Sequence, residues 1–118
     1  MSEINPALII KDMVYCIDHI MQYTEGLNFD NFTDNFMLRE ACLYNLQVIG
    51  EAVVQLPDLV KDSEPTIPWK LIKGMRNRLI HFYFGTDMPM VWNVITNELP
   101  SFKNELQRIY NSLNEQDW

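Results

Sequence analysis

The clearest structural pattern in the sequence lies in DNFMLREACLYNLQVIGEAVVQLP, residues 34–57. Its apolar residues recur every three or four positions, which is the spacing of one face of an α-helix. That face carries Leu38, Cys42, Leu46, Ile49, Val53 and Leu56, and Pro57 ends the pattern. The stretch therefore predicts a long amphipathic helix from about Asp34 to Leu56.

A second helix is predicted on the N-terminal side of this stretch. Asn5 is a suitable N-cap, Pro6 suits the first helical position, and the pattern stops near Gly26. The apolar residues with helical spacing are Ile9, Met13, Ile17 and Ile20. The Asn- and Asp-rich segment NFDNFTD (residues 28–34) is interpreted as a short connection between the two helices.

The C-terminal half predicts two more helices. The segment DLVKDSEPTIP (residues 58–68) has the composition of a loop, and its last proline suits the first turn of a helix over residues 69–84. The final helix is expected to begin after Asp87, with a kink or restart near Glu98 because Pro100 interrupts its register. Its repeating apolar residues are Val91, Ile95, Leu99, Phe102, Leu106, Ile109 and Leu113. Four such helices with short connections predict an all-α fold, an antiparallel four-helix bundle.

Composition limits the class of protein. The 118 residues, 47% of them hydrophobic, suit one globular domain over residues 1–118, with no internal repeat or long linker. A net charge of −7 argues against a general nucleic-acid coat or a binder of anionic membranes. No signal pattern or membrane-length apolar run is visible, so we expect a cytoplasmic protein that does not bind membranes.

Neither cysteine nor histidine spacing indicates a metal. Cys16 and Cys42 lie in apolar runs and are expected to be buried, reduced thiols. His19 and His81 fall on different predicted helices, without cysteine or carboxylate partners at ligand spacing. The sequence predicts no metal site and no cofactor, and His19 is interpreted as a surface or packed residue.

The stretch WKLIKGMRNRLIHFYF, residues 69–84, differs from the acidic remainder of the chain. Four of the nine basic residues of the protein fall within nine positions, namely Lys70, Lys73, Arg76 and Arg78. On a helical wheel Leu71, Ile72, Met75, Leu79 and Phe82 form the face toward the core, and Lys70, Lys73, Asn77 and His81 form the opposite stripe. The polar residues therefore occupy a surface that the core does not use.

The spacing of Arg76 and His81 restricts how they can act together. Five residues turn them about 140° apart on an ideal helix, so one regular helix does not bring both to the same atom. Either the helix deforms, or a second copy of the chain completes the site, as a homodimer would.

Arginine and histidine on one surface suit a phosphodiester. Arginine offers a planar fork of donors to phosphate oxygens, and neutral histidine accepts a proton near pH 7. A base that removes the ribose 2′-OH proton and a cation that stabilises the charge at phosphorus suffice to cleave RNA without a metal. The alternative is that these basic residues form an ordinary solvated face.

The motif RNRLIHFY, with Arg76, Asn77, His81 and Tyr83, resembles the signature of HEPN-domain ribonucleases and in particular of HepT-like toxins. The segments NLQVIGEA, IPWKLIKGMRN and FGTDMPMVWNVITNELP are also similar to that family, and together the resemblance covers roughly residues 5–110. It implies a HEPN-like helical domain that dimerises with two motifs lining one cleft.

The resemblance also implies residue roles. Arg76 and His81 would be the catalytic pair and Asn77 a polar helper, while Lys70, Lys73 and Arg78 are expected to bind RNA phosphates. The family's toxins pair with a minimal nucleotidyltransferase (MNT) antitoxin, which implies a type VII-like toxin–antitoxin pair silenced by AMP transfer (AMPylation) to Tyr83.

Several alternatives stay open. Tyr83 could instead pack against Arg76 or bind RNA, and Glu51 could pair with Arg76 or support the close helix approach at Gly50. Trp69 and Trp92 are interpreted as core or dimer-interface residues. The whole chain could be a non-catalytic helical partner that presents substrate or nucleotide to a nucleotidyltransferase, or a purely structural dimerisation domain.

Overall fold

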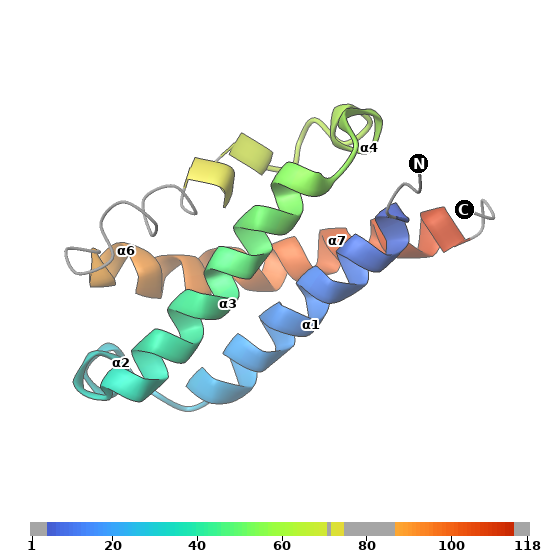
Figure 1. Ribbon diagram of the computed structural model, residues 1–118. Coiled ribbons are helices and arrows are strands. Elements are labelled where there is room, and N and C mark those ends of the chain that lie inside the picture. The colour runs from blue at the N-terminus through green and yellow to red at the C-terminus, as the bar shows by residue number, and fades with distance from the viewer. Residues whose placement is uncertain (1–4, 71, 75–86, 115–118) are drawn as a thin grey trace.

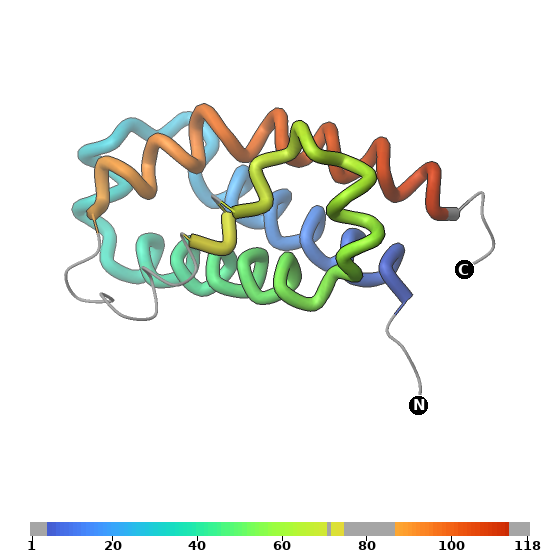
Figure 2. The backbone as a smooth tube through the Cα atoms, turned by 90° about the horizontal axis from the view of Figure 1, so that it is seen from above, coloured from blue at the N-terminus to red at the C-terminus, as the bar shows by residue number. Residues whose placement is uncertain are grey.

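The computed structural model describes residues 5–70, 72–74 and 87–114, and these residues form helices with no β-strand among them (Figure 1). The three long helices are α1 (Pro6–Thr24), α3 (Phe36–Gln55) and α7 (Leu99–Asn114). Helix α1 packs against both α3 and α7 and runs antiparallel to them, as two views show (Figures 1 and 2). The all-α prediction is confirmed. Most of the helix predicted over residues 69–84 lies outside the described residues, so the four-helix count stays a prediction.

The predicted apolar faces form the core. On α1, Ile9, Met13, Ile17 and Ile20 are buried, and on the last predicted helix all seven repeating apolar residues from Val91 to Leu113 are buried. In the stretch of residues 34–57, Cys42, Leu46, Ile49, Val53 and Leu56 are buried, while Leu38 is half-buried against the same core. A period of three to four residues therefore identified the side chains that are removed from water.

Asparagine side chains cap the N-termini of α1 and α3. The Oδ1 atom of Asn5 accepts a hydrogen bond from the Ala7 N–H at 2.9 Å, and Pro6 follows at the first position, as predicted. Helix α3 begins in the same way, because Asn35 Oδ1 accepts from the Leu38 N–H at 3.1 Å. Gly26, just beyond the end of α1, has a φ of +74°, a conformation that glycine adopts without a steric cost.

The interpretation of residues 28–34 as a connection is wrong. These residues form α2 (Phe29–Asp34), which Asn28 begins. Asn28 and Asn31 each accept a hydrogen bond from the backbone N–H of the other, at 2.8 and 3.2 Å, so that two otherwise unpaired donors are satisfied. Phe32 is fully buried with its ring centroid 5.0 Å from that of Trp92, and this contact holds the short helix on the core.

The loop predicted over residues 58–68 also contains a helix. Helix α4 (Asp58–Asp62) follows Pro57 directly and buries Val60. Its single turn is too short to show a periodic apolar pattern, and for this reason the segment was predicted to be a loop.

The predicted break near Glu98 is present as a π-helix. Helix α6 (Met88–Asn93), which Asp87 caps, continues into η1 (Val94–Glu98) and then into α7. The Leu99 N–H donates to the Val94 carbonyl, five residues back, where an α-helix would use the fourth residue back. Pro100 lacks an N–H and cannot continue the regular ladder, so the widened turn accommodates it.

Candidate functional site

The sequence motif itself lies outside the residues that the structure describes. This holds for Arg76, Asn77, Arg78, His81 and Tyr83, and also for Leu71, Met75, Leu79 and Phe82 of the predicted core face. The roles proposed for these residues stay predictions. The structure does describe residues 69–70 and 72–74, which are helical, and the surface beside them. They are the first turn of the helix predicted over residues 69–84, which is called the motif helix below.

Trp69 anchors this first turn to the core. Its side chain is only 8% exposed, its ring meets Phe102 of α7 edge-on at 6.0 Å between centroids, and its Nε1–H donates to the Glu64 carbonyl at 3.1 Å. Ile72 is buried as predicted, and its N–H donates to the carbonyl of Pro68 at 3.2 Å. Trp69 is therefore a core residue, one of the two roles expected of it.

The burial of Trp69 and Ile72 leaves the two lysines of this turn outside. Lys70 and Lys73 are both exposed, as the helical wheel predicted for the polar stripe. Across the described residues neither lysine forms an ion pair. Two ammonium groups therefore stand on the surface three residues apart, just before the motif begins.

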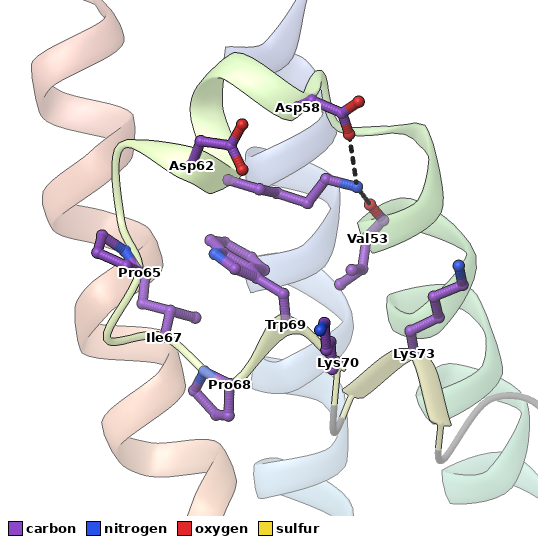
Figure 3. Close-up of a pocket in the computed structure, with 10 residues that line it drawn as sticks. Val53, Asp58, Asp62, Pro65, Ile67, Pro68, Trp69, Lys70 and Lys73 are labelled. Carbon is purple, nitrogen blue, oxygen red and sulfur yellow. Dashed lines mark hydrogen bonds and ion pairs between the residues drawn. The ribbon is translucent and has the colours of Figure 1, made fainter.

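A cleft of about 520 Å³ opens beside these lysines (Figure 3). Helix α4 contributes Asp58, Lys61 and Asp62 along one edge, the following segment contributes Pro65 and Ile67, and the first turn of the motif helix contributes Trp69, Lys70 and Lys73. The cleft thus has apolar, cationic and anionic parts within one concave surface.

Lys61 is the residue of this cleft that sequence reasoning missed. Its Nζ donates to the Val53 carbonyl at 3.1 Å and lies 3.7 Å from an Asp58 carboxylate oxygen. The last carbonyls of a helix have no partner within the helix, so Lys61 satisfies one at the end of α3. Its spacing from Asp58 was visible in the sequence, but its reach to α3 was not.

Glu64 and Arg108 fasten the segment that carries this cleft to α7. Arg108 donates to both Glu64 carboxylate oxygens, at 2.6 and 3.3 Å, and also to Glu105 at 2.6 Å. The hydrogen bond from Arg108 lowers the pKa of the Glu64 carboxyl below its usual value. Because the Glu64 backbone also accepts from Trp69, the two contacts hold the start of the motif helix in place.

Trp92, His19 and Glu51 lie within the described residues. Trp92 is half-buried against Phe32, and His19 lies between Tyr15 and Tyr23, with ring centroids 4.2 and 5.9 Å away. Glu51 is half-buried on α3, and which of its two proposed roles it fills stays open.

Both cysteines are buried and free, as expected. Burial raises the pKa of the Cys42 thiol to about 12, and burial together with Asp12 raises the pKa of Cys16. In the described ranges no three His, Cys, Asp or Glu side chains gather as a metal site would require, and no helix there has the length and apolarity to span a membrane.

Comparison with known proteins gives the family. Residues 13–109, a span that includes the entire motif, match the family described as "Ribonuclease HepT-like". The chain belongs to the HepT-like ribonuclease family. The resemblance seen in the motif is thereby confirmed.

Relatives named as ribonucleases align with this chain over almost their whole length. A Methanocaldococcus jannaschii protein named "Putative RNase MJ0125" is 36% identical over 106 residues, which cover 90% of this chain and 91% of the relative. "Probable ribonuclease HepT" of Thermococcus cleftensis is 31% identical over 100 residues, covering 85% of this chain and 91% of the relative. No solved structure matches the chain. For this HepT-like protein, ribonuclease activity is supported at the level of the family.

Proposed function

We propose that this HepT-like protein is a metal-independent endoribonuclease and the toxin of a type VII-like toxin–antitoxin pair, acting in the cytoplasm as one domain over residues 1–118. The observation that carries the proposal is the family membership, and it is supported by two exposed lysines, Lys70 and Lys73, which form no ion pair with any described residue. Lys70 and Lys73, with Arg78, would attract the phosphates of RNA to the motif despite the acidic charge of the whole chain.

The proposed chemistry is attack of the ribose 2′-oxygen on the adjacent phosphorus. His81 takes the 2′-OH proton, Arg76 stabilises the negative charge on the phosphate oxygens, and Asn77 orients the phosphate. The bond from phosphorus to the 5′-oxygen breaks as the 2′-oxygen bond forms, and the 5′-oxygen leaves with a proton. The products are a 2′,3′-cyclic phosphate and a 5′-hydroxyl.

Cleavage in the presence of EDTA tests this function. We expect the purified protein, shown by mass spectrometry to carry no AMP, to cut RNA in EDTA, and His81→Ala to lose about 10²-fold or more of the rate, as loss of a general base does. Lys11→Gln, a change on the exposed surface of α1, is the matched control and should keep full activity. Equal cleavage by wild type and His81→Ala contradicts the catalytic role of His81. No cleavage by either contradicts a metal-independent ribonuclease and favours the non-catalytic partner or the dimerisation domain.

We further propose that an MNT antitoxin silences the toxin by transferring AMP from ATP to the Tyr83 hydroxyl, with release of pyrophosphate. An anionic, bulky AMP beside Arg76 would occupy the place of the RNA phosphate. With ATP and the antitoxin, wild type should gain mass in steps of AMP, and Tyr83→Phe should gain none. A mass gain that persists in Tyr83→Phe would exclude this tyrosine as the acceptor.

A further inference from the structure

The exposed charged side chains of the cleft lie in two groups, one on α4 and one on the first turn of the motif helix. Lys61 donates to the Val53 carbonyl and lies 3.7 Å from an Asp58 carboxylate oxygen, while the Asp58 side chain itself is 93% exposed. Lys70 and Lys73 on one side and Asp62 on α4 are exposed and form no ion pair with any residue that the structure describes. A ligand in this cleft therefore meets the cations of Lys70 and Lys73 on one side and the carboxylates of α4, Asp58 and Asp62, on the other.

An apolar surface lies between the two charged parts. Figure 3 shows the Trp69 ring in the middle of the cleft, with Pro65 and Ile67 on one side and Lys70 and Lys73 on the other. Trp69 is fixed there by its hydrogen bond to Glu64 and its contact with Phe102, so this surface is preformed. The side chains of Trp69 and Ile67 are largely buried, at 8% and 4% exposed, and Pro65 is exposed, so a nucleobase would lie against an apolar wall here rather than stack on an open ring.

One unpaired nucleotide has the matching order of groups: an anionic phosphate, a flat base, and polar atoms on the far edge of the base. A volume of about 520 Å³ lies within the range of small-molecule sites, roughly 300–1,000 Å³. A carboxylate such as Asp62 accepts a hydrogen bond from an exocyclic amino group, which cytosine presents at N4. Uracil has a carbonyl oxygen at the same place, and two acceptors facing one another repel.

We propose that this cleft is a subsite for one nucleotide of single-stranded RNA, with the phosphate on Lys70 and Lys73 and the base directed toward Asp62. The subsite selects a base with an exocyclic amino group and disfavours uracil. This inference rests on the proposed ribonuclease function, because it assigns the cleft to one nucleotide of the RNA substrate.

Binding of two matched oligonucleotides tests the subsite. The probes are 2′-O-methyl hexamers of cytidine and of uridine, which have no free 2′-hydroxyl and cannot be cleaved by 2′-oxygen attack. The full-length protein is titrated against each, with fluorescence anisotropy as the readout. We expect the cytidine hexamer to bind about fivefold more tightly or better, the lower range for one good base contact.

Variants of the two charged parts should have different effects. Asp62→Ala should bring the ratio of the two affinities close to one, whereas Asp12→Ala, an exposed carboxylate on α1, should leave the ratio unchanged. Lys73→Gln should weaken both hexamers equally and reduce the slope of log affinity against log salt by about 0.7, the value for one phosphate contact on a single strand. Lys11→Gln should change neither.

The outcomes separate this inference from the proposed function. Equal binding of the two hexamers by wild type, or a preference that Asp62→Ala leaves intact, overturns the subsite even if RNA is cut. A cytidine preference that depends on Asp62, in a protein that does not cut unmodified RNA, supports the subsite and overturns the ribonuclease. Free cytidine monophosphate that competes as well as the hexamer overturns the assignment to RNA.

Discussion

Glu64 joins three parts of the molecule through two different groups. Its carboxylate accepts from Arg108 of α7, and its backbone carbonyl accepts from the Trp69 indole. The Glu64 side chain is 22% exposed and the Arg108 side chain 52%, so water and salt screen the pair. The contact is thus expected to position the segment more than to stabilise the whole fold.

The lowered pKa of Glu64 predicts a pH dependence of stability. A carboxyl whose pKa is lower in the folded state stabilises the protein above its unfolded pKa of about 4.3, and this stabilisation is lost as the pH falls through the folded pKa. The difference in free energy of unfolding between wild type and Glu64→Gln should therefore be largest above about pH 6 and shrink toward pH 3. Urea denaturation at several pH values measures it.

The Arg108→Gln background is the control for this prediction. Without Arg108 the cause of the lowered pKa is removed, so the effect of Glu64→Gln should vary less with pH. A difference that stays the same between pH 7 and pH 3 in the wild-type background contradicts the assignment.

At the scale of the elements, three helices begin at an asparagine side chain. Asn5, Asn28 and Asn35 each accept a hydrogen bond from a backbone N–H of the first turn. The cap of α1 was predicted from Asn5 and Pro6, because a long apolar pattern follows them. The cap of α2 was missed, since six residues carry too little periodicity for a helix to be recognised and the Asn-rich composition resembled a turn.

Loss of the Asn35 cap should destabilise α3, which buries Leu46, Ile49 and Val53 in the core. Asn35→Ala removes the acceptor for the Leu38 N–H and is expected to lower the free energy of unfolding by about 1 kcal/mol. Asn35→Gly should lower the free energy of unfolding by only a few tenths of about 1 kcal/mol. Chemical denaturation measures both changes, and a loss of the same size in Asn111→Ala, an exposed residue inside α7, would contradict a specific capping effect.

At the scale of the whole molecule, we propose that a homodimer completes the active site, with Arg76 of one chain near His81 of the other. A symmetric pair of chains would then contain two composite sites, each built from both chains. One regular helix turns these two residues about 140° apart, so the other way to bring them together is a deformed helix within one chain.

Mixed dimers test the composite site. Chains carrying Arg76→Ala and His81→Ala are co-expressed with different tags, and dimers that hold one of each are isolated with both tags. One of the two composite sites in such a dimer is intact, so its rate of RNA cleavage should be about half that of wild type. The two pure variants are the controls and should be inactive. A mixed dimer as inactive as either variant would show that each site forms within one chain.

The helical class, the long apolar faces and the family could be predicted from the sequence, because burial follows a period of three to four residues and the motif has a fixed spacing. Three contacts became visible only in the folded chain: Lys61 reaches the end of α3, Arg108 holds Glu64, and Asp62 lines the same cleft as Lys73. The residues of these contacts are separated along the chain. Periodicity reports which face of one helix is removed from water, whereas a cleft forms where separate segments meet, and their meeting depends on how the whole chain packs.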